Sequence, residues 1–76
     1  MKNKFYSLWC CQNHEYMASG RNSATKEEVK EGLLSFLSGD YDEEDIKRLS
    51  VYKPDELAEM YEFEIHEHDE PLPENY

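Results

Sequence analysis

The sequence predicts a single α+β domain, in which a small three-stranded antiparallel sheet carries about three helices packed on one face, in the order ββαααβ. Three observations predict this class. A long apolar stripe at helical spacing lies in residues 25–37, two further helix-start signals follow it, and residues 62–68 alternate strictly between polar and apolar side chains. The 76 residues have room for one domain with a modest core, expected over residues 1–68.

The first two elements are expected to form a β-hairpin. Residues 4–11 are rich in aromatic and small apolar side chains, which favours a strand, and residues 16–19 can run back beside it after a polar break. The sequence leaves open which face of the first strand is turned to the core. One face carries Tyr6, Leu8 and Cys10, and the other carries Phe5, Ser7, Trp9 and Cys11.

The central helix is expected over residues 25–37 and should end before Gly39. Thr25 is its predicted N-cap, and Glu28, three residues on, completes a capping box. Gly32 inside the helix costs about 1 kcal/mol relative to Ala, which indicates either close approach by another backbone or a tolerated surface glycine. The side chains expected to face the core are those of the apolar stripe: Val29, Leu33, Leu34, Phe36 and Leu37.

Two shorter helices and a final strand should follow. Asp42 is a good N-cap for a helix that runs to about Leu49, and Pro54 suits the first position of the next helix. The inward side chains of that helix are expected to be Leu57, Met60 and Tyr61. In the strand, Phe63 and Ile65 should lie on one face, opposite Glu62, Glu64, His66 and His68.

The end of the chain differs from the rest in composition. Residues 69–76 contain Pro71 and Pro73, several acids and few apolar groups, so they are expected to form an acidic, flexible tail.

The charge of the chain is divided unevenly between its two parts. Residues 1–30 carry five Lys or Arg and three Glu, a net charge of +2, whereas residues 31–76 carry three Lys or Arg and fifteen Asp or Glu, a net charge of −12. Contacts to nucleic acid and to anionic membranes are made by Lys and Arg. The total of −10 therefore argues against direct binding to nucleic acid or to a membrane surface.

The cysteines and the N-terminal sequence predict a cytoplasmic protein. Cys10 and Cys11 are adjacent, and neighbouring strand residues point to opposite faces, so a disulfide between them is geometrically poor and reduced thiols are expected. Residues 5–11 are too short and too polar an apolar run for a secretory signal. No stretch approaches the roughly 18 apolar residues of a membrane span.

Thiols and imidazoles form two weak candidate sites for chemistry. Zinc prefers such ligands, and the weak candidates for a metal site are Cys10, His14, His66 and His68. The alternative is that the histidines are solvated strand residues and the cysteines are small packing groups. Because no Cys-x-x-Cys spacing supports a metal site, no metal or other cofactor is predicted.

The other candidate site is a cysteine nucleophile, with Cys10 or Cys11 beside His14 or His66. Acidic surroundings raise the pKa of a thiol and so oppose this role. The sequence also lacks a phosphate-binding loop and a nucleophile elbow. A protein without enzymatic activity is therefore expected.

The acidic surface is the third candidate site. A dense array of carboxylates can occupy a basic groove that normally holds nucleic acid, and long-range attraction raises the rate of association. The alternative is that the acids only keep the protein soluble. The side chains expected to contact a partner are acids of two helix starts and the last strand, with two aromatic anchors: Asp42, Glu43, Glu44, Asp45, Asp55, Glu56, Glu59, Glu62, Glu64, Trp9 and Tyr16.

In its size, charge and lack of a catalytic motif, the chain resembles, as a class, the small acidic inhibitors that phages and mobile elements carry against host nucleases, including anti-CRISPR proteins. This resemblance implies an inhibitor that occupies the basic nucleic-acid-binding surface of a partner protein, such as a nucleic-acid-binding enzyme. The alternative is a small regulatory or accessory module that binds its partner through a sheet edge or an aromatic patch.

Overall fold

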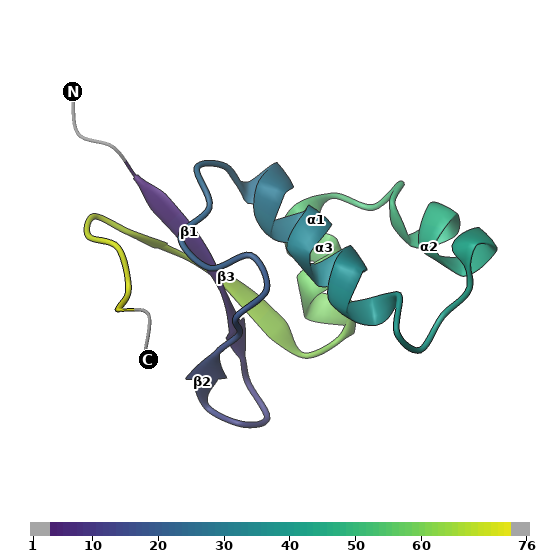
Figure 1. Ribbon diagram of the computed structural model, residues 1–76, viewed down its shortest axis with the longest axis horizontal. Coiled ribbons are helices and arrows are strands. Elements are labelled where there is room, and N and C mark those ends of the chain that lie inside the picture. The colour runs from purple at the N-terminus through teal and green to yellow at the C-terminus, as the bar shows by residue number, and fades with distance from the viewer. Residues whose placement is uncertain (1–3, 74–76) are drawn as a thin grey trace.

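The computed structural model describes residues 4–73, and its elements follow the predicted order ββαααβ (Figure 1). The predicted class, a three-stranded antiparallel sheet with three helices, is confirmed. The strands and helices are β1 (Phe5–Cys10), β2 (Glu15–Tyr16), α1 (Lys26–Leu37), α2 (Glu43–Leu49), α3 (Pro54–Met60) and β3 (Phe63–His68). No helix within the described range is long and apolar enough to cross a membrane.

The central strand of the sheet is β1, in the order β2-β1-β3. Its register pairs Trp9 with Tyr16 of β2, and Leu8 with Ile65 of β3. β2 is shorter than the predicted strand over residues 16–19. The Met17 N–H still donates to the Leu8 carbonyl at 2.8 Å, but beyond it the chain bends out of the ladder.

The three helices begin where local side chains satisfy their first N–H groups. The Thr25 hydroxyl accepts from the Glu28 N–H at 3.2 Å, and the Asp42 carboxylate accepts from the Asp45 N–H at 2.9 Å. The Glu28 carboxylate accepts from the Ala24 N–H at 2.8 Å, one residue before the predicted partner. The third helix begins at Pro54, as predicted.

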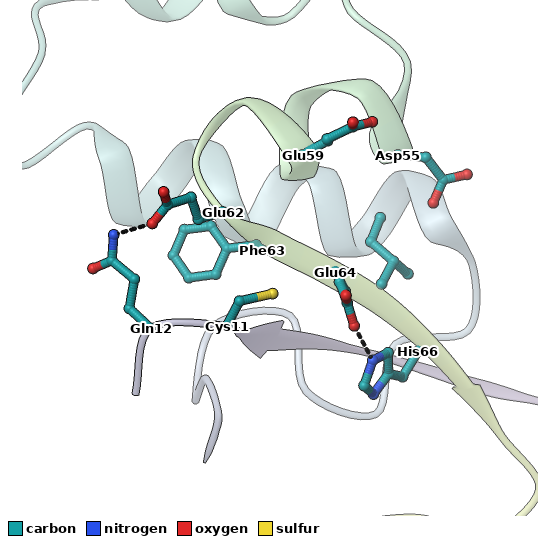
Figure 2. A pocket seen from close by; sticks show the side chains of 9 residues that line it. Cys11, Gln12, Asp55, Glu59, Glu62, Phe63, Glu64 and His66 are labelled. Atoms are coloured by element: carbon teal, nitrogen blue, oxygen red, sulfur yellow. Dashed lines mark hydrogen bonds and ion pairs between the residues drawn. The ribbon is translucent and has the colours of Figure 1, made fainter. Parts of the chain in front are cut away.

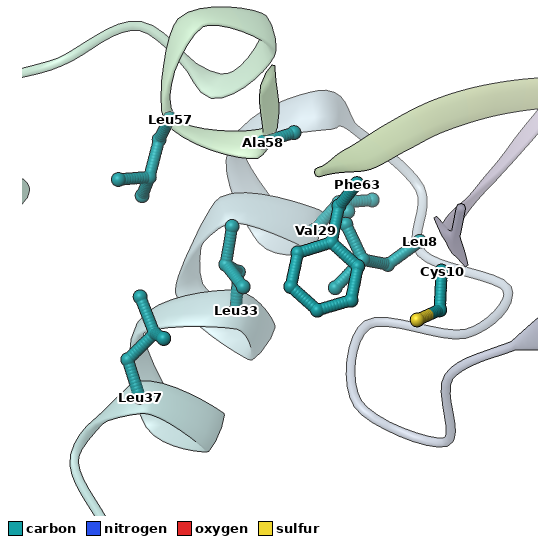
Figure 3. Close-up of a cluster of buried hydrophobic side chains, with 8 residues drawn as sticks. All are labelled: Leu8, Cys10, Val29, Leu33, Leu37, Leu57, Ala58 and Phe63. Atoms are coloured by element: carbon teal, nitrogen blue, oxygen red, sulfur yellow. The ribbon is translucent and has the colours of Figure 1, made fainter. Parts of the chain in front are cut away.

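The core lies between the sheet and the helices α1 and α3 (Figure 3). Leu8 and Cys10 point into it, and Tyr6 packs against it, which decides the open question about the two faces of β1. The buried side chains are Leu8, Cys10, Val29, Leu33, Leu37, Leu57, Ala58 and Phe63.

Two predicted core residues are largely exposed instead, Phe36 at 46% and Met60 at 49%. On α3, Leu57 and Ala58 are buried, so the inward face is centred between them and Met60 falls outside it. Phe36 lies at the margin of the α1 stripe, where its ring meets the ring of Phe63 edge-on, with the centroids 6.2 Å apart. Both predictions were wrong because the apolar residues at helical spacing span a wider part of each helix surface than the part that packs against the core.

Two loops are held by contacts to backbone atoms, and the sequence alone did not identify the residues that meet there. Gly32 of α1 packs against the backbone of Gly20, so of the two alternatives that the sequence left open, close approach is the one observed. After β3 the chain folds back, and the Asn22 side-chain amide both donates to the Leu72 carbonyl at 3.0 Å and accepts from the Leu72 N–H at 2.8 Å (Figure 1). Residues 74–76 of the predicted tail lie outside the described residues.

Candidate functional site

An open groove of about 650 Å³ runs beside β3, and we call it the acidic groove. Figure 2 shows Asp55 and Glu59 on α3, with Glu64 and His66 on β3 itself. Within the described part of the chain, no Lys or Arg is among its lining residues. These are Cys11, Gln12, Asp55, Glu59, Glu62, Phe63, Glu64, Ile65 and His66.

Local geometry brings the four carboxylates of the acidic groove together. Asp55 and Glu59 are four residues apart on α3, so they lie on the same helix face. Glu62, at φ 62°, is in the left-handed region and turns the chain from α3 into β3. Glu64 lies two residues after Glu62, and the alternation of side chains along β3 turns it to one face of the strand.

Three of these carboxylates have polar neighbours that position them. Lys26 Nζ lies 3.0 Å from Asp55 Oδ2, and the Gln12 amide donates to Glu62. His66 Nε2 lies 2.8 Å from Glu64 Oε1, and this hydrogen bond lowers the pKa of Glu64 below its usual value. Glu64 is therefore ionised at neutral pH. One lysine offsets at most one of the four carboxylates, so the groove remains predominantly negative.

The Cys11 thiol in the groove is kept protonated. Its pKa is raised, first by burial and then by the negative charge and hydrogen bonding of Glu64, with smaller contributions from Cys10 and Glu62. Since the thiolate is the reactive form of cysteine, these surroundings make Cys11 a poor nucleophile.

The sheet face opposite the helices carries a second group of side chains, which we call the aromatic face. Trp9 stacks on the His66 ring at 5.5 Å and meets Tyr16 edge-on at 4.9 Å between centroids. Ser7 Oγ lies 2.9 Å from His68 Nε2. Neighbouring rings half-bury His66 and His68, so neither is a fully solvated strand residue. The face comprises Phe5, Ser7, Trp9, Tyr16, His66 and His68.

The hydrogen bonds of His66 link the aromatic face to the acidic groove. A carboxylate only accepts, so Nε2 of the ring donates to Glu64, and Nδ1 lies 2.9 Å from the Tyr16 hydroxyl oxygen. This chain of hydrogen bonds orients the His66 ring and the Glu64 carboxylate. The predicted anchors Trp9 and Tyr16 are thus half-buried and packed on each other.

The weak metal candidates are not brought together by the fold. Cys10 is buried on the helix-covered face of the sheet, whereas His66 and His68 lie on the opposite face. His14 sits in the turn after β1, where its ring meets Trp9 edge-on at 6.4 Å. No group of three or more His, Cys, Asp or Glu between residues 4 and 73 could hold a metal ion.

The predicted partner-binding acids fall into two separate places. Four of them line the acidic groove, whereas those of the first turn of α2 and its cap lie at the end of the molecule far from the strands (Figure 1). Glu56 accepts from the Lys53 N–H at 3.1 Å and so caps α3. Sequence analysis missed Gln12 as a groove residue, because only the β1–β3 register places it beside Glu62.

Comparisons with known proteins give no relative for this chain: no family model, no curated protein and no solved structure matches it. Its function must therefore be inferred from the residues themselves.

Proposed function

We propose that this protein is a non-enzymatic inhibitor that binds another protein by seating a basic, nucleic-acid-binding surface of that protein on the acidic groove. The observation that carries this proposal is the gathering of four carboxylates on the walls of one open groove. The groove residues are Asp55, Glu59, Glu62 and Glu64, and no Lys or Arg lines it within residues 4–73.

Electrostatics favour a cationic occupant of the groove. Each exposed pair of opposite charges contributes only about 0–1 kcal/mol, so the attraction depends on several carboxylates acting together. Glu64 is held ionised by His66, so a Lys or Arg that enters the groove meets a charge already in place. The acids at the start of α2 lie away from the groove, so the proposed contact does not include them.

The surroundings of the candidate nucleophile support binding rather than catalysis. The thiol of Cys11 stays protonated beside Glu64, and Cys10 is buried among core side chains. A partner whose basic surface is covered by the groove loses that surface for nucleic acid, because phosphates and carboxylates compete for the same Lys and Arg side chains.

The test is affinity capture from the native host with a matched pair of variants. The groove variant carries Glu59→Gln, Glu62→Gln and Glu64→Gln, and the control variant removes the same charge elsewhere through Glu31→Gln, Glu43→Gln and Glu44→Gln. We expect the groove variant to bind the captured partner about tenfold or more weakly than the control variant does. The unmodified protein should also displace nucleic acid from that partner.

Salt provides the second arm of this test. Binding should weaken strongly between about 0.05 and 0.5 M salt, because mobile ions screen exposed charges. The proposal is overturned if the two variants bind the partner equally, if salt has no effect, or if the partner retains its nucleic acid when saturated with this protein.

A further inference from the structure

The outer edge of β3 is open. Within the described residues β3 pairs only with β1, at one side of the sheet. The Cys11 N–H donates to the Glu62 carbonyl at 3.1 Å, so in the alternating antiparallel ladder the backbone groups of Glu64 turn toward β1. Those of Phe63 and Ile65 therefore turn away from β1, where no described strand meets them.

The acidic groove follows this same edge. Five of its lining residues are consecutive, from Glu62 to His66, so the groove runs along the strand rather than across it. Asp55 and Glu59 of α3 flank it on the helix side, and Glu64 projects on the opposite face of the sheet (Figure 2). An extended chain laid along the edge would have carboxylates on both of its faces.

We infer that the outer edge of β3 accepts an extended, Lys- or Arg-rich segment of the partner protein as an added strand. The inference rests on the proposed function and specifies how the basic surface is held. The outward N–H and C=O groups of Phe63 and Ile65 pair with the backbone of the segment. Its alternate side chains reach Asp55 and Glu59 on one face and Glu64 on the other.

Charge selects a basic segment over a second copy of this chain. Each copy carries a formal net charge of −10 and would bring its own acids to the shared edge. Charged side chains on an edge strand are a known protection against self-pairing. The same side chains attract a segment of opposite charge. The edge therefore disfavours pairing with a second copy of this chain and favours pairing with a basic segment.

The test uses the full chain and a synthetic peptide of alternating lysine and valine with blocked ends, six residues long to match β3. Its lysines share one face, which is expected to lie on the side of Asp55 and Glu59. Amide hydrogen exchange is followed by NMR in about 0.05 M salt. We expect the Phe63 and Ile65 amides to exchange about tenfold or more slowly when the peptide is bound, because an added strand protects outward N–H groups. The Tyr6 amide, already bonded to the Ser23 carbonyl, should not change.

Two modified peptides separate strand pairing from simple charge attraction. N-methylation of alternate peptide amides removes the donors of one edge, so one of the two possible patterns should weaken binding about tenfold or more while the other is tolerated. A peptide of equal charge with proline in place of valine should not protect Phe63 or Ile65. The matched protein variants are Asp55→Asn with Glu59→Gln, which should weaken binding, and Glu43→Gln with Glu44→Gln, which should not.

Binding without amide protection, or with equal affinity for both N-methylated peptides, overturns the inference and leaves the proposed function standing. Absence of binding to the lysine peptide also overturns the inference, whereas the capture experiment decides the proposed function separately. Equal binding of a glutamate and valine peptide overturns the charge selection.

Discussion

The backbone of Gly20 lies directly against Gly32 of α1. A Cβ on Gly32 would fall 2.5 Å from the Gly20 nitrogen and 2.7 Å from its Cα, closer than atoms can approach without displacement. Gly20 itself has φ 74°, in the region that glycine adopts without strain. This contact docks the loop after β2 onto α1 with no side chain between them.

Replacing Gly32 by alanine should therefore destabilise the protein, although alanine is the better helix former. The new methyl group meets backbone, which cannot rotate away as a side chain can, so we expect a loss of about 1–3 kcal/mol in the free energy of unfolding. Urea denaturation followed by circular dichroism measures it.

Gly39→Ala is the control for this prediction, because its Cβ would meet only the Phe36 carbonyl at 3.7 Å, an ordinary contact. A Gly32→Ala variant as stable as the unmodified protein would contradict the close packing of Gly20 on α1.

Leu57 anchors the short helix α3 to the core and should be sensitive to truncation. Its side chain is fully buried, so Leu57→Ala removes apolar contacts and leaves a cavity, with an expected loss of about 2–5 kcal/mol. Val51, which is 79% exposed, provides the control, and Val51→Ala should change the free energy of unfolding by less than about 0.5 kcal/mol. If chemical denaturation showed equal losses for Leu57→Ala and Val51→Ala, the packing of α3 on the core through Leu57 would be contradicted.

The Cys11 thiol should react slowly with alkylating reagents. Burial and the neighbouring Glu64 raise its pKa, so little thiolate is present at neutral pH. We expect iodoacetamide to modify Cys11 more slowly than a cysteine in an unstructured peptide, and Glu64→Gln to raise the rate about twofold or more. Mass spectrometry of the digested protein distinguishes Cys11 from Cys10, and Glu43→Gln should leave the rate unchanged.

The Glu64–His66 hydrogen bond should make stability depend on pH in the acidic range. The pKa of Glu64 is lowered in the folded protein, so ionisation of this group stabilises the fold above the unfolded pKa of about 4.3. That contribution is lost as the pH falls through the lower, folded pKa. Glu64→Gln should therefore show a smaller drop in denaturation midpoint between about pH 6 and pH 3 than Glu43→Gln does. An unchanged pH dependence would contradict the hydrogen bond.

The starts of the helices could be predicted from sequence because they depend on residues close together in the chain. Asp42 caps α2 through the Asp45 N–H, three residues away, and Pro54 opens α3 by its own fixed φ. The inward face of β1 could not be predicted, because both faces carry apolar groups and only packing against α1 separates them.

The candidate site was only partly predictable for the same reason. The sequence identified the acids as candidate binding residues. Gln12 and Cys11 join them in the groove only through the pairing of β1 with β3. The burial of His66 under Trp9 likewise depends on this register, since alternation alone places the histidine on a polar face.

The order of the strands also determines when the domain can form during its synthesis. β1 leaves the ribosome first, but the strand that completes its far side, β3, is made only after all three helices. Until then the apolar and aromatic side chains of β1 have no β3 beside them, and such nascent surfaces are prone to aggregate or to recruit chaperones. Translation of the last strand is therefore the step that closes the sheet.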